Sequence, residues 1–183
     1  MGKGLKLPLN CRRCHSAPET LAHVMGTCSK NNGLINQRHN QVLDLVKKTA
    51  GRQKDPKANL QIEPTIKTAS GNFRPDLLYV TEKEIHVIDV TCPIEGGQNM
   101  QDSRTGKLQK YEPLRQHLEE THGKKATVQT IVIGMLGAWD PENFTTLTSL
   151  DIPRHRQVTL ARRSIEASID GTRRIYATHV RKA

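Results

Sequence analysis

The sequence is poor in aromatic side chains and has no long apolar run. Of its 183 residues, 3% are aromatic and 35% hydrophobic, enough for one modest aliphatic core with or without a small appendage. No apolar run approaches the ~20 residues that span a bilayer, so no membrane partner is expected. The first residues also lack the apolar region of a secretory signal. We therefore expect an intracellular protein.

Cysteine is scarce too, yet three of the four cysteines lie close together beside a histidine. Cysteine and histidine are the usual ligands of tetrahedral zinc, and four of them fall within eighteen residues: Cys11, Cys14, His23 and Cys28. The pattern predicts a closed, structural zinc site. A disulfide or free thiols are the alternatives, and an intracellular setting disfavours the disulfide. His15 adjoins Cys14 and is a poorer ligand, while Cys92 is expected to be a buried free thiol.

Acidic residues are few at both ends of the chain. Residues 1–55 carry 10 Lys/Arg against 3 Asp/Glu, and residues 151–183 carry 8 against 3, whereas residues 56–150 have 10 against 12. Basic flanks around a slightly acidic centre suit a polyanion held at both ends. Nucleic acid is the expected partner, and a solvated basic surface is the alternative.

Three segments are predicted. Apolar spacing over residues 34–46 indicates a helix with Ile35, Val42, Leu43 and Val46 buried and with Arg38 and His39 on other faces, ended by Gly51. The polar residues 52–59 are taken as a boundary. The resulting division is a zinc-binding segment with its helix (1–55), a central core (56–150) and basic C-terminal helices (151–183).

The centre of the chain contains a predicted β-hairpin. Apolar runs of strand length end at Val80 and begin at Ile85, with residues 81–84 between them. In this register Asp76 faces Asp89 across the hairpin, where like charges are destabilising. A divalent metal bound by both carboxylates is the favoured explanation. A solvated hairpin end, or a loop one residue longer or shorter, is the alternative. Glu63 is a weaker candidate third ligand.

Residues after the hairpin complete a strand–strand–helix–strand order. Leu108, Tyr111, Leu114 and Leu118 are expected on one helical face, with Lys107 and Lys110 on an adjoining face. Pro113 should kink this helix or restart it.

The pattern of residues 126–134 predicts a buried strand. Two helices, 154–168 and 172–180, are expected to be broken at Asp170-Gly171. The fold class is α/β, with a small mixed sheet and flanking helices.

Three motifs follow one another along the chain: Arg74-Pro75-Asp76, then Ile88-Asp89-Val90-Thr91, then Lys107-x-x-Lys110-Tyr111. Together they resemble the restriction-enzyme-like endonuclease of site-specific non-LTR retrotransposons that insert into ribosomal RNA genes. The cysteine and histidine cluster, Arg38-His39-Asn40 and the segment around Trp139 resemble the zinc knuckle and further parts of the same proteins. The resemblance covers residues 11 to about 150. It implies a PD-(D/E)xK nuclease core, in a C-terminal piece of a Pol polyprotein whose reverse transcriptase (an RNA-directed DNA polymerase) is absent here.

The resemblance further implies a nucleus-located, Mg²⁺-dependent DNA endonuclease whose nick leaves a 3′-hydroxyl that primes reverse transcription. Asp76 and Asp89, with a main-chain carbonyl near Val90, would hold the metal. Thr91 stands where the usual lysine would be, so Lys107 or Lys110 would supply it. Tyr111 would line the site, and a place in the core is the alternative. Arg38, His39 and Arg74 would contact DNA. Target DNA, element RNA and the rest of the polyprotein are the implied partners.

Two other interpretations remain open at this point. One is a non-catalytic, zinc-containing module that positions a polyprotein on nucleic acid. The other is a decayed copy of the element. Paired carboxylates facing a polyanion favour the nuclease, because a pure binding module gains nothing from them.

Overall fold

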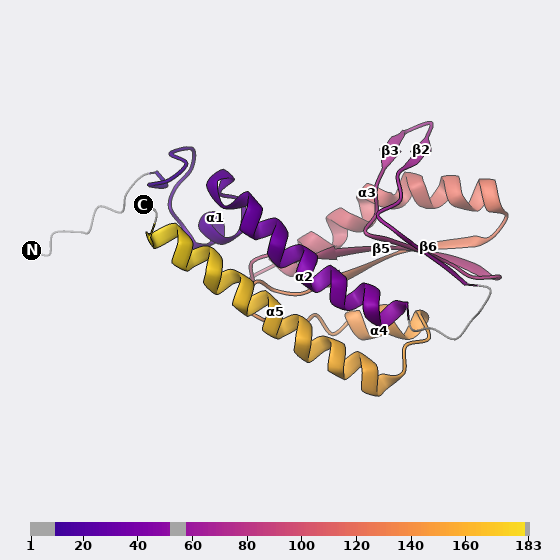
Figure 1. Cartoon of the computed structure of the whole chain (residues 1–183). Helices are drawn as coiled ribbons and strands as arrows, with labels where there is room; N and C mark the ends of the chain where they lie inside the picture. Colours follow the sequence, from indigo (N-terminus) through magenta and orange to yellow (C-terminus); the bar gives the residue numbers. More distant parts are fainter. Residues whose placement is uncertain (1–9, 52–57, 182–183) are drawn as a thin grey trace, which may run out of the picture.

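The computed structural model describes residues 10–51 and 58–181. A four-stranded sheet with the order β1-β4-β5-β6 lies at its centre, and helices cover both faces (Figure 1). None of the helices described is long and apolar enough to cross a membrane. The sheet strands are β1 (Asn59–Ile62), β4 (Leu77–Val80), β5 (Glu84–Thr91) and β6 (Lys125–Val132), with a separate β2 (Ile66–Thr68) and β3 (Gly71–Phe73) hairpin; the helices are α1 (Leu21–Gly26), the short 3-10 helix η1 (Ser29–Asn31), α2 (Asn32–Ala50), α3 (Asn99–His122), α4 (Asn143–Ser149) and α5 (Arg154–Arg181).

The hairpin between β4 and β5 forms in the predicted register. Val80 pairs with Ile85 and Leu78 pairs with Val87. Thr81 closes the turn, because its side chain accepts hydrogen bonds from the backbone N–H groups of Lys83 and Glu84. The pairing ends at Leu77 and Ile88, so β4 starts directly after Asp76.

The order strand–strand–helix–strand is also confirmed. After β5 the chain crosses over through α3 and returns as β6, which lies parallel to β5 over its whole length, from Glu84–Lys125 to Thr91–Val132. A parallel pair needs such a crossover connection, and a helix is the usual one. The mixed α/β class predicted from the sequence is therefore present.

Each face of the sheet has its own apolar cluster. Leu78, Ile85 and Val87 pack against Tyr111, Leu114 and Leu118 of α3. The opposite face packs against α2, α4 and α5, in a cluster formed by Val42, Leu43, Val46, Leu77, Tyr79, Ile88, Val90, Ile131, Ile133, Leu147, Leu150, Ile152 and Leu160. This second cluster takes residues from all three predicted segments. Residues 52–57 of the predicted boundary lie outside the described residues.

Helices α2 and α5 lie side by side and run in opposite directions (Figure 1). The predicted break at Asp170-Gly171 is wrong, because α5 is continuous from Arg154 to Arg181. Gly171 serves helix packing instead: a Cβ at this position would lie 2.6 Å from Cγ of Arg38 on α2. The absence of a side chain lets Arg38 lie against α5, and the contact outweighs the low intrinsic helix propensity of glycine.

The two predicted amphipathic stripes need correction. In α2, Arg38 is 2% exposed and extends the buried stripe of Val42 and Val46, instead of lying on another face. In α3, Leu108 is 36% exposed, and Arg104 is buried one turn earlier. The restart at Pro113 is wrong, since α3 is one helix with Pro113 inside it; Gly123 ends it in the left-handed conformation, φ 62°.

Candidate functional site

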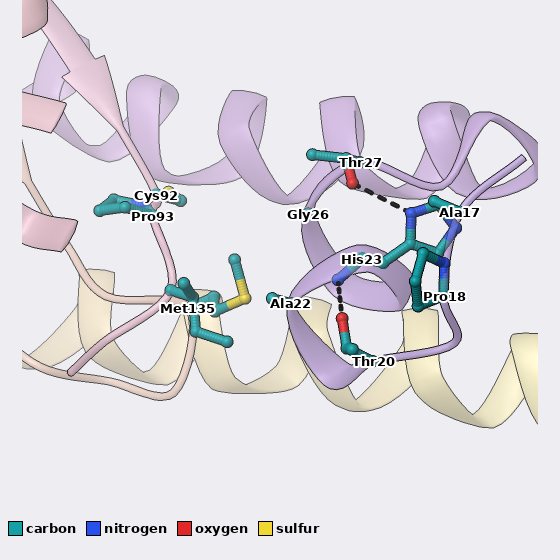
Figure 2. A pocket seen from close by; sticks show the side chains of 11 residues that line it. Ala17, Pro18, Thr20, Ala22, His23, Gly26, Thr27, Cys92, Pro93 and Met135 are labelled. Carbon is teal, nitrogen blue, oxygen red and sulfur yellow. Dashed lines mark hydrogen bonds between the residues drawn. The ribbon is translucent and has the colours of Figure 1, made fainter. Parts of the chain in front are cut away.

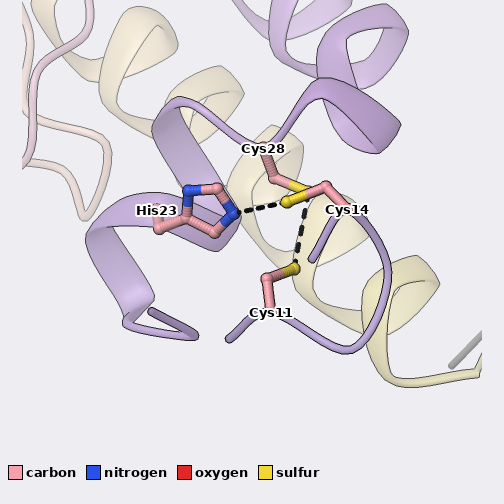
Figure 3. Close-up of side chains that lie close together, drawn as sticks. All are labelled: Cys11, Cys14, His23 and Cys28. Carbon is pink, nitrogen blue, oxygen red and sulfur yellow. Dashed lines mark hydrogen bonds between the residues drawn. The ribbon is translucent and has the colours of Figure 1, made fainter. Parts of the chain in front are cut away.

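The four predicted zinc ligands converge on one point (Figure 3). Their ligand atoms all lie within 4.8 Å of one another. Sγ of Cys11 is 3.8 Å from Sγ of Cys28, and about 3.8 Å is the edge of a tetrahedron with Zn–S bonds of about 2.3 Å. Sγ of Cys14 is 3.1 Å from Nε2 of His23. The geometry and the chemistry of this Cys₃His set therefore fit a zinc ion.

The local fold orients these ligands. Thr20 caps α1 by accepting a hydrogen bond from the N–H of His23, and the ring nitrogen Nδ1 of His23 lies 3.2 Å from the Thr27 hydroxyl. Such a contact at the second nitrogen fixes the ring for ligation through Nε2. The hydrogen bond to Ser16 lowers the pKa of the Cys14 thiol to about 6, which favours the thiolate that binds metal, whereas burial raises the pKa of Cys28.

The C-terminal helix supports this cluster through contacts that no sequence pattern indicated. His179 of α5 is buried, with Nε2 3.3 Å from the Glu19 carboxylate and 3.9 Å from Sγ of Cys11. Its other ring nitrogen lies 3.3 Å from Nδ2 of Asn31. These contacts join residues 148 to 168 positions apart in the chain.

An apolar hollow separates the zinc cluster from the central sheet (Figure 2). Its volume is about 470 Å³, and Met135 points across it toward Gly26 of α1, where a Cβ would lie 3.3 Å from the Met135 methyl group. Val24, Met25 and Met135 form the apolar contact beside it. The hollow is lined by Ala17, Pro18, Thr20, Ala22, His23, Gly26, Thr27, Cys92, Pro93, Ile94 and Met135.

Asp76 lies directly before the first residue of β4, where the backbone ladder with β5 stops. Its Oδ2 accepts a hydrogen bond of 2.7 Å from the backbone N–H of Val90 in β5. The side chain thus replaces the carbonyl that a longer β4 would have offered to this donor. Because the carboxylate is 14% exposed, solvent reaches it at the edge of the sheet.

Asp89 points from β5 toward α3 and is almost completely buried. The Tyr111 hydroxyl lies 2.7 Å from its Oδ1, and Nζ of Lys107 lies 2.7 Å from its Oδ2. The Lys107 ammonium group thus forms a close ion pair with the buried carboxylate. Burial, and after it the charge of Asp89, raises the pKa of Tyr111, so the phenol stays protonated.

The two predicted lysines have different neighbours. Lys107 contacts the Asp89 carboxylate directly, whereas Nζ of Lys110 lies 3.0 Å from the Tyr111 hydroxyl and 4.5 Å from the centre of its ring. Buried Arg104, one turn before Lys107, holds this part of α3 in place through Asp140 at 2.7 Å and the Thr130 hydroxyl at 2.8 Å. The sequence did not single out Arg104.

His39 reaches the same site from α2, on the other side of the sheet. Its Nε2 lies 3.1 Å from the Val90 carbonyl oxygen and 3.4 Å from Oδ2 of Asp76. The hydrogen bond to Asp76 raises the pKa of His39 to about 9, so the ring is a cation at neutral pH. The sequence suggested His39 as a DNA contact and gave no sign of its proximity to Asp76.

The remaining predicted site residues lie elsewhere. Arg38 does not reach the surface: its guanidinium donates to the Thr172 hydroxyl at 2.9 Å, which leaves DNA contact by Arg38 without support. Arg74 is 64% exposed and pairs with Glu63 at 3.1 Å, and its contact with DNA stays a prediction. This ion pair occupies Glu63, so the structure gives no support to Glu63 as a metal ligand. Cys92 is a free thiol, as predicted, but it is half-buried and not fully buried; desolvation still raises its pKa to about 11.

The acidic site has the chemistry that a hard cation uses. Mg²⁺ is bound typically through one or two carboxylates, with waters and substrate phosphates as the other ligands. Asp89 of β5 and Asp76, directly before β4, supply two carboxylates, and the only charged partner that the described residues give the Asp89 carboxylate is Lys107. Within residues 10–51 and 58–181, these aspartates belong to no cluster of three Cys, His, Asp or Glu ligands. The donor set therefore fits an ion that is completed by water and phosphate.

No protein-family model matches the chain. Over 107 residues, 58% of its length, it is 31% identical to the retrovirus-related Pol polyprotein from type-2 retrotransposable element R2DM of Drosophila melanogaster. Over 149 residues, 79% of its length, it is 26% identical to the retrovirus-related Pol polyprotein from type-1 retrotransposable element R2 of Nasonia vitripennis. The matches span 10% and 14% of these two curated relatives. The predicted resemblance to retrotransposon Pol polyproteins is thus confirmed, and the similarity is to R2 elements.

Proposed function

We propose that this chain is the metal-dependent DNA endonuclease part of an R2-like retrotransposon Pol polyprotein, with a PD-(D/E)xK-type core and a structural zinc knuckle. The observation that carries the proposal is the buried Asp89 carboxylate with the Lys107 ammonium group 2.7 Å from it, on the strand next to the one that follows Asp76. If the two carboxylates were merely solvated at the end of a hairpin, neither would need to be buried beside an ammonium group. The similarity to Pol polyproteins of R2 elements supports the same function.

In this proposal Asp76 and Asp89 would hold Mg²⁺, and a bound Mg²⁺ would supply Lewis-acid polarisation of the scissile phosphate and a more acidic water ligand. Lys107, whose side chain is 32% exposed, is the group that offsets negative charge developing on the phosphate. Tyr111 fixes the orientation of Asp89 through its hydroxyl. Lys110 neighbours that hydroxyl, which makes Lys107 the preferred candidate for the catalytic lysine.

The finer assignments follow from the family that the sequence resembles. The substrate would be target DNA in a ribosomal RNA gene, in the nucleus, and the product a nick with a 3′-hydroxyl. Another part of the polyprotein would use this end to prime reverse transcription of the element RNA. The basic residues of the two flanking segments, together with exposed Arg74, would hold DNA phosphates, and this binding should weaken as salt rises.

The test is a nicking assay of the full chain on supercoiled DNA carrying a ribosomal RNA gene, with Mg²⁺, with Mn²⁺ and with EDTA. Asp76→Asn and Asp89→Asn keep the side-chain shape and should abolish nicking while DNA binding, measured by gel shift, is retained. Asp102→Asn removes an exposed carboxylate of α3 and is the matched control. Nicking that survives in both site variants contradicts the proposal. DNA binding by a wild-type chain that nicks with neither metal favours the binding module.

A further inference from the structure

The edge of β5 at Val90 lacks its normal strand partner. Extending the β4–β5 register beyond Leu77–Ile88 places Pro75 opposite Val90. In the antiparallel ladder this is a position of the hydrogen-bonded kind, at which each of the two opposed residues donates its N–H to the carbonyl oxygen of the other. Proline has no N–H, so the Val90 carbonyl would have no donor from β4. The Arg74-Pro75-Asp76 motif therefore interrupts the ladder at the point where the candidate metal ligands stand.

Two side chains replace the missing backbone partners. The N–H and C=O of a strand residue point to the same edge, so both groups of Val90 face beyond the end of β4. The Asp76 carboxylate accepts from the Val90 N–H at 2.7 Å. Nε2 of His39 lies 3.1 Å from the Val90 carbonyl oxygen and 3.4 Å from the same Asp76 carboxylate.

We propose that His39 is a positioning residue of the nuclease site, whose Nε2–H holds the Asp76 carboxylate and the Val90 carbonyl in a fixed orientation toward the metal. This inference rests on the proposed function. Asp76 follows a proline and precedes the first paired residue of β4, so its side chain needs a second contact to keep one orientation. The carbonyl oxygen has two lone pairs and can accept from His39 while one pair remains free for a cation.

The position of His39 is itself well determined. It lies beside Arg38, which is held by Thr172 of α5, and the buried residues Val42 and Val46 follow one and two turns later. The first turn of α2 directly follows η1 and Cys28 of the zinc cluster. Helix α2 thus fixes one side chain of the nuclease site from outside the strand–strand–helix–strand core.

Two substitutions distinguish a role of His39 as a hydrogen-bond donor from a role of its ring as a space-filling group. His39→Phe keeps the ring and removes the donor, whereas His39→Gln keeps an N–H donor at a similar reach. Gln37→Ala, an exposed neighbour on the same helix, is the control. Mn²⁺ binding is measured by titration calorimetry, and the nicking rate is measured as a function of Mn²⁺ and of DNA concentration.

We expect His39→Phe to weaken Mn²⁺ binding and to lower the maximal nicking rate by roughly 10- to 100-fold, the usual loss for residues that orient metal ligands. His39→Gln should recover most of both, and DNA affinity should not change in either variant. Equal Mn²⁺ affinity in wild type and His39→Phe overturns the inference. Tighter Mn²⁺ binding by His39→Phe also overturns it, because His39 would then be occupying the place of the cation.

These outcomes can be told apart from failure of the proposed function. If Asp76→Asn abolishes Mn²⁺ binding and nicking while His39→Phe changes neither, the nuclease assignment stands and only the role of His39 is wrong. If the wild-type chain neither binds Mn²⁺ at this site nor nicks DNA, the proposed function itself is wrong, and the inference that depends on it fails too.

Discussion

The zinc cluster and the acidic site are built in opposite ways. All four zinc ligands lie within residues 11–28, and a tight turn and one short helix bring them together. The acidic site takes Asp76 from the start of β4, Asp89 from β5, Lys107 and Tyr111 from α3, and His39 from α2. Ligands that lie close together in the sequence can be predicted from the spacing of their residue types. A site whose residues come from four separate elements depends on how the whole chain folds.

The largest expected effect comes from breaking the local site. Cys28→Ser should abolish zinc binding and unfold residues 11–28, because structural zinc contributes on the order of 10–16 kcal/mol of apparent binding free energy in small zinc-binding units. Bound zinc is measured by mass spectrometry of the native protein. Cys92→Ser, which removes a thiol outside the cluster, is the control and should keep one zinc per chain. Retention of zinc by Cys28→Ser would show that the cluster is not the site.

The next effect separates the two lysines of the assembled site. Lys107→Met should lower the nicking rate by roughly 10²- to 10³-fold, since it removes a preorganised charge from the proposed reaction centre. Lys110→Met should cost less, because its ammonium group neighbours Tyr111 and not the carboxylate. The two rates are measured under single-turnover conditions. A larger loss for Lys110→Met would reverse the assignment.

The smallest effect probes the contact that joins the zinc cluster to distant sequence. His179→Phe keeps a ring but removes the polar contacts to Glu19 and Asn31, and should lower the free energy of unfolding by about 1–3 kcal/mol, as for buried polar groups left without partners. Urea denaturation measures the loss. Tyr176→Phe, on an exposed position of α5, should be neutral. Zinc content should not change in His179→Phe; loss of zinc would mean that the cluster is not a local unit.

Much of the framework could be predicted because it depends on short-range patterns. The register of β4 and β5 followed from alternation on both sides of a four-residue break, and residue 81 supplies the turn that fixes it. The end of α2 followed from Gly51. The break at Asp170-Gly171 was predicted wrongly because helix propensity is local, whereas the close approach of Arg38 is a tertiary contact.

The sequence by itself determined the convergence of the four zinc ligands, the register of the β4–β5 hairpin, and the strand–strand–helix–strand order. These features rest on spacing and on alternation of side chains along one or two adjacent elements. Only the tertiary structure decided that Lys107 and not Lys110 contacts Asp89, that Arg38 is buried, and that His39 reaches Val90. Each of these depends on how α2, α3 and α5 pack on the sheet, and packing between distant elements leaves no periodic signal in the sequence.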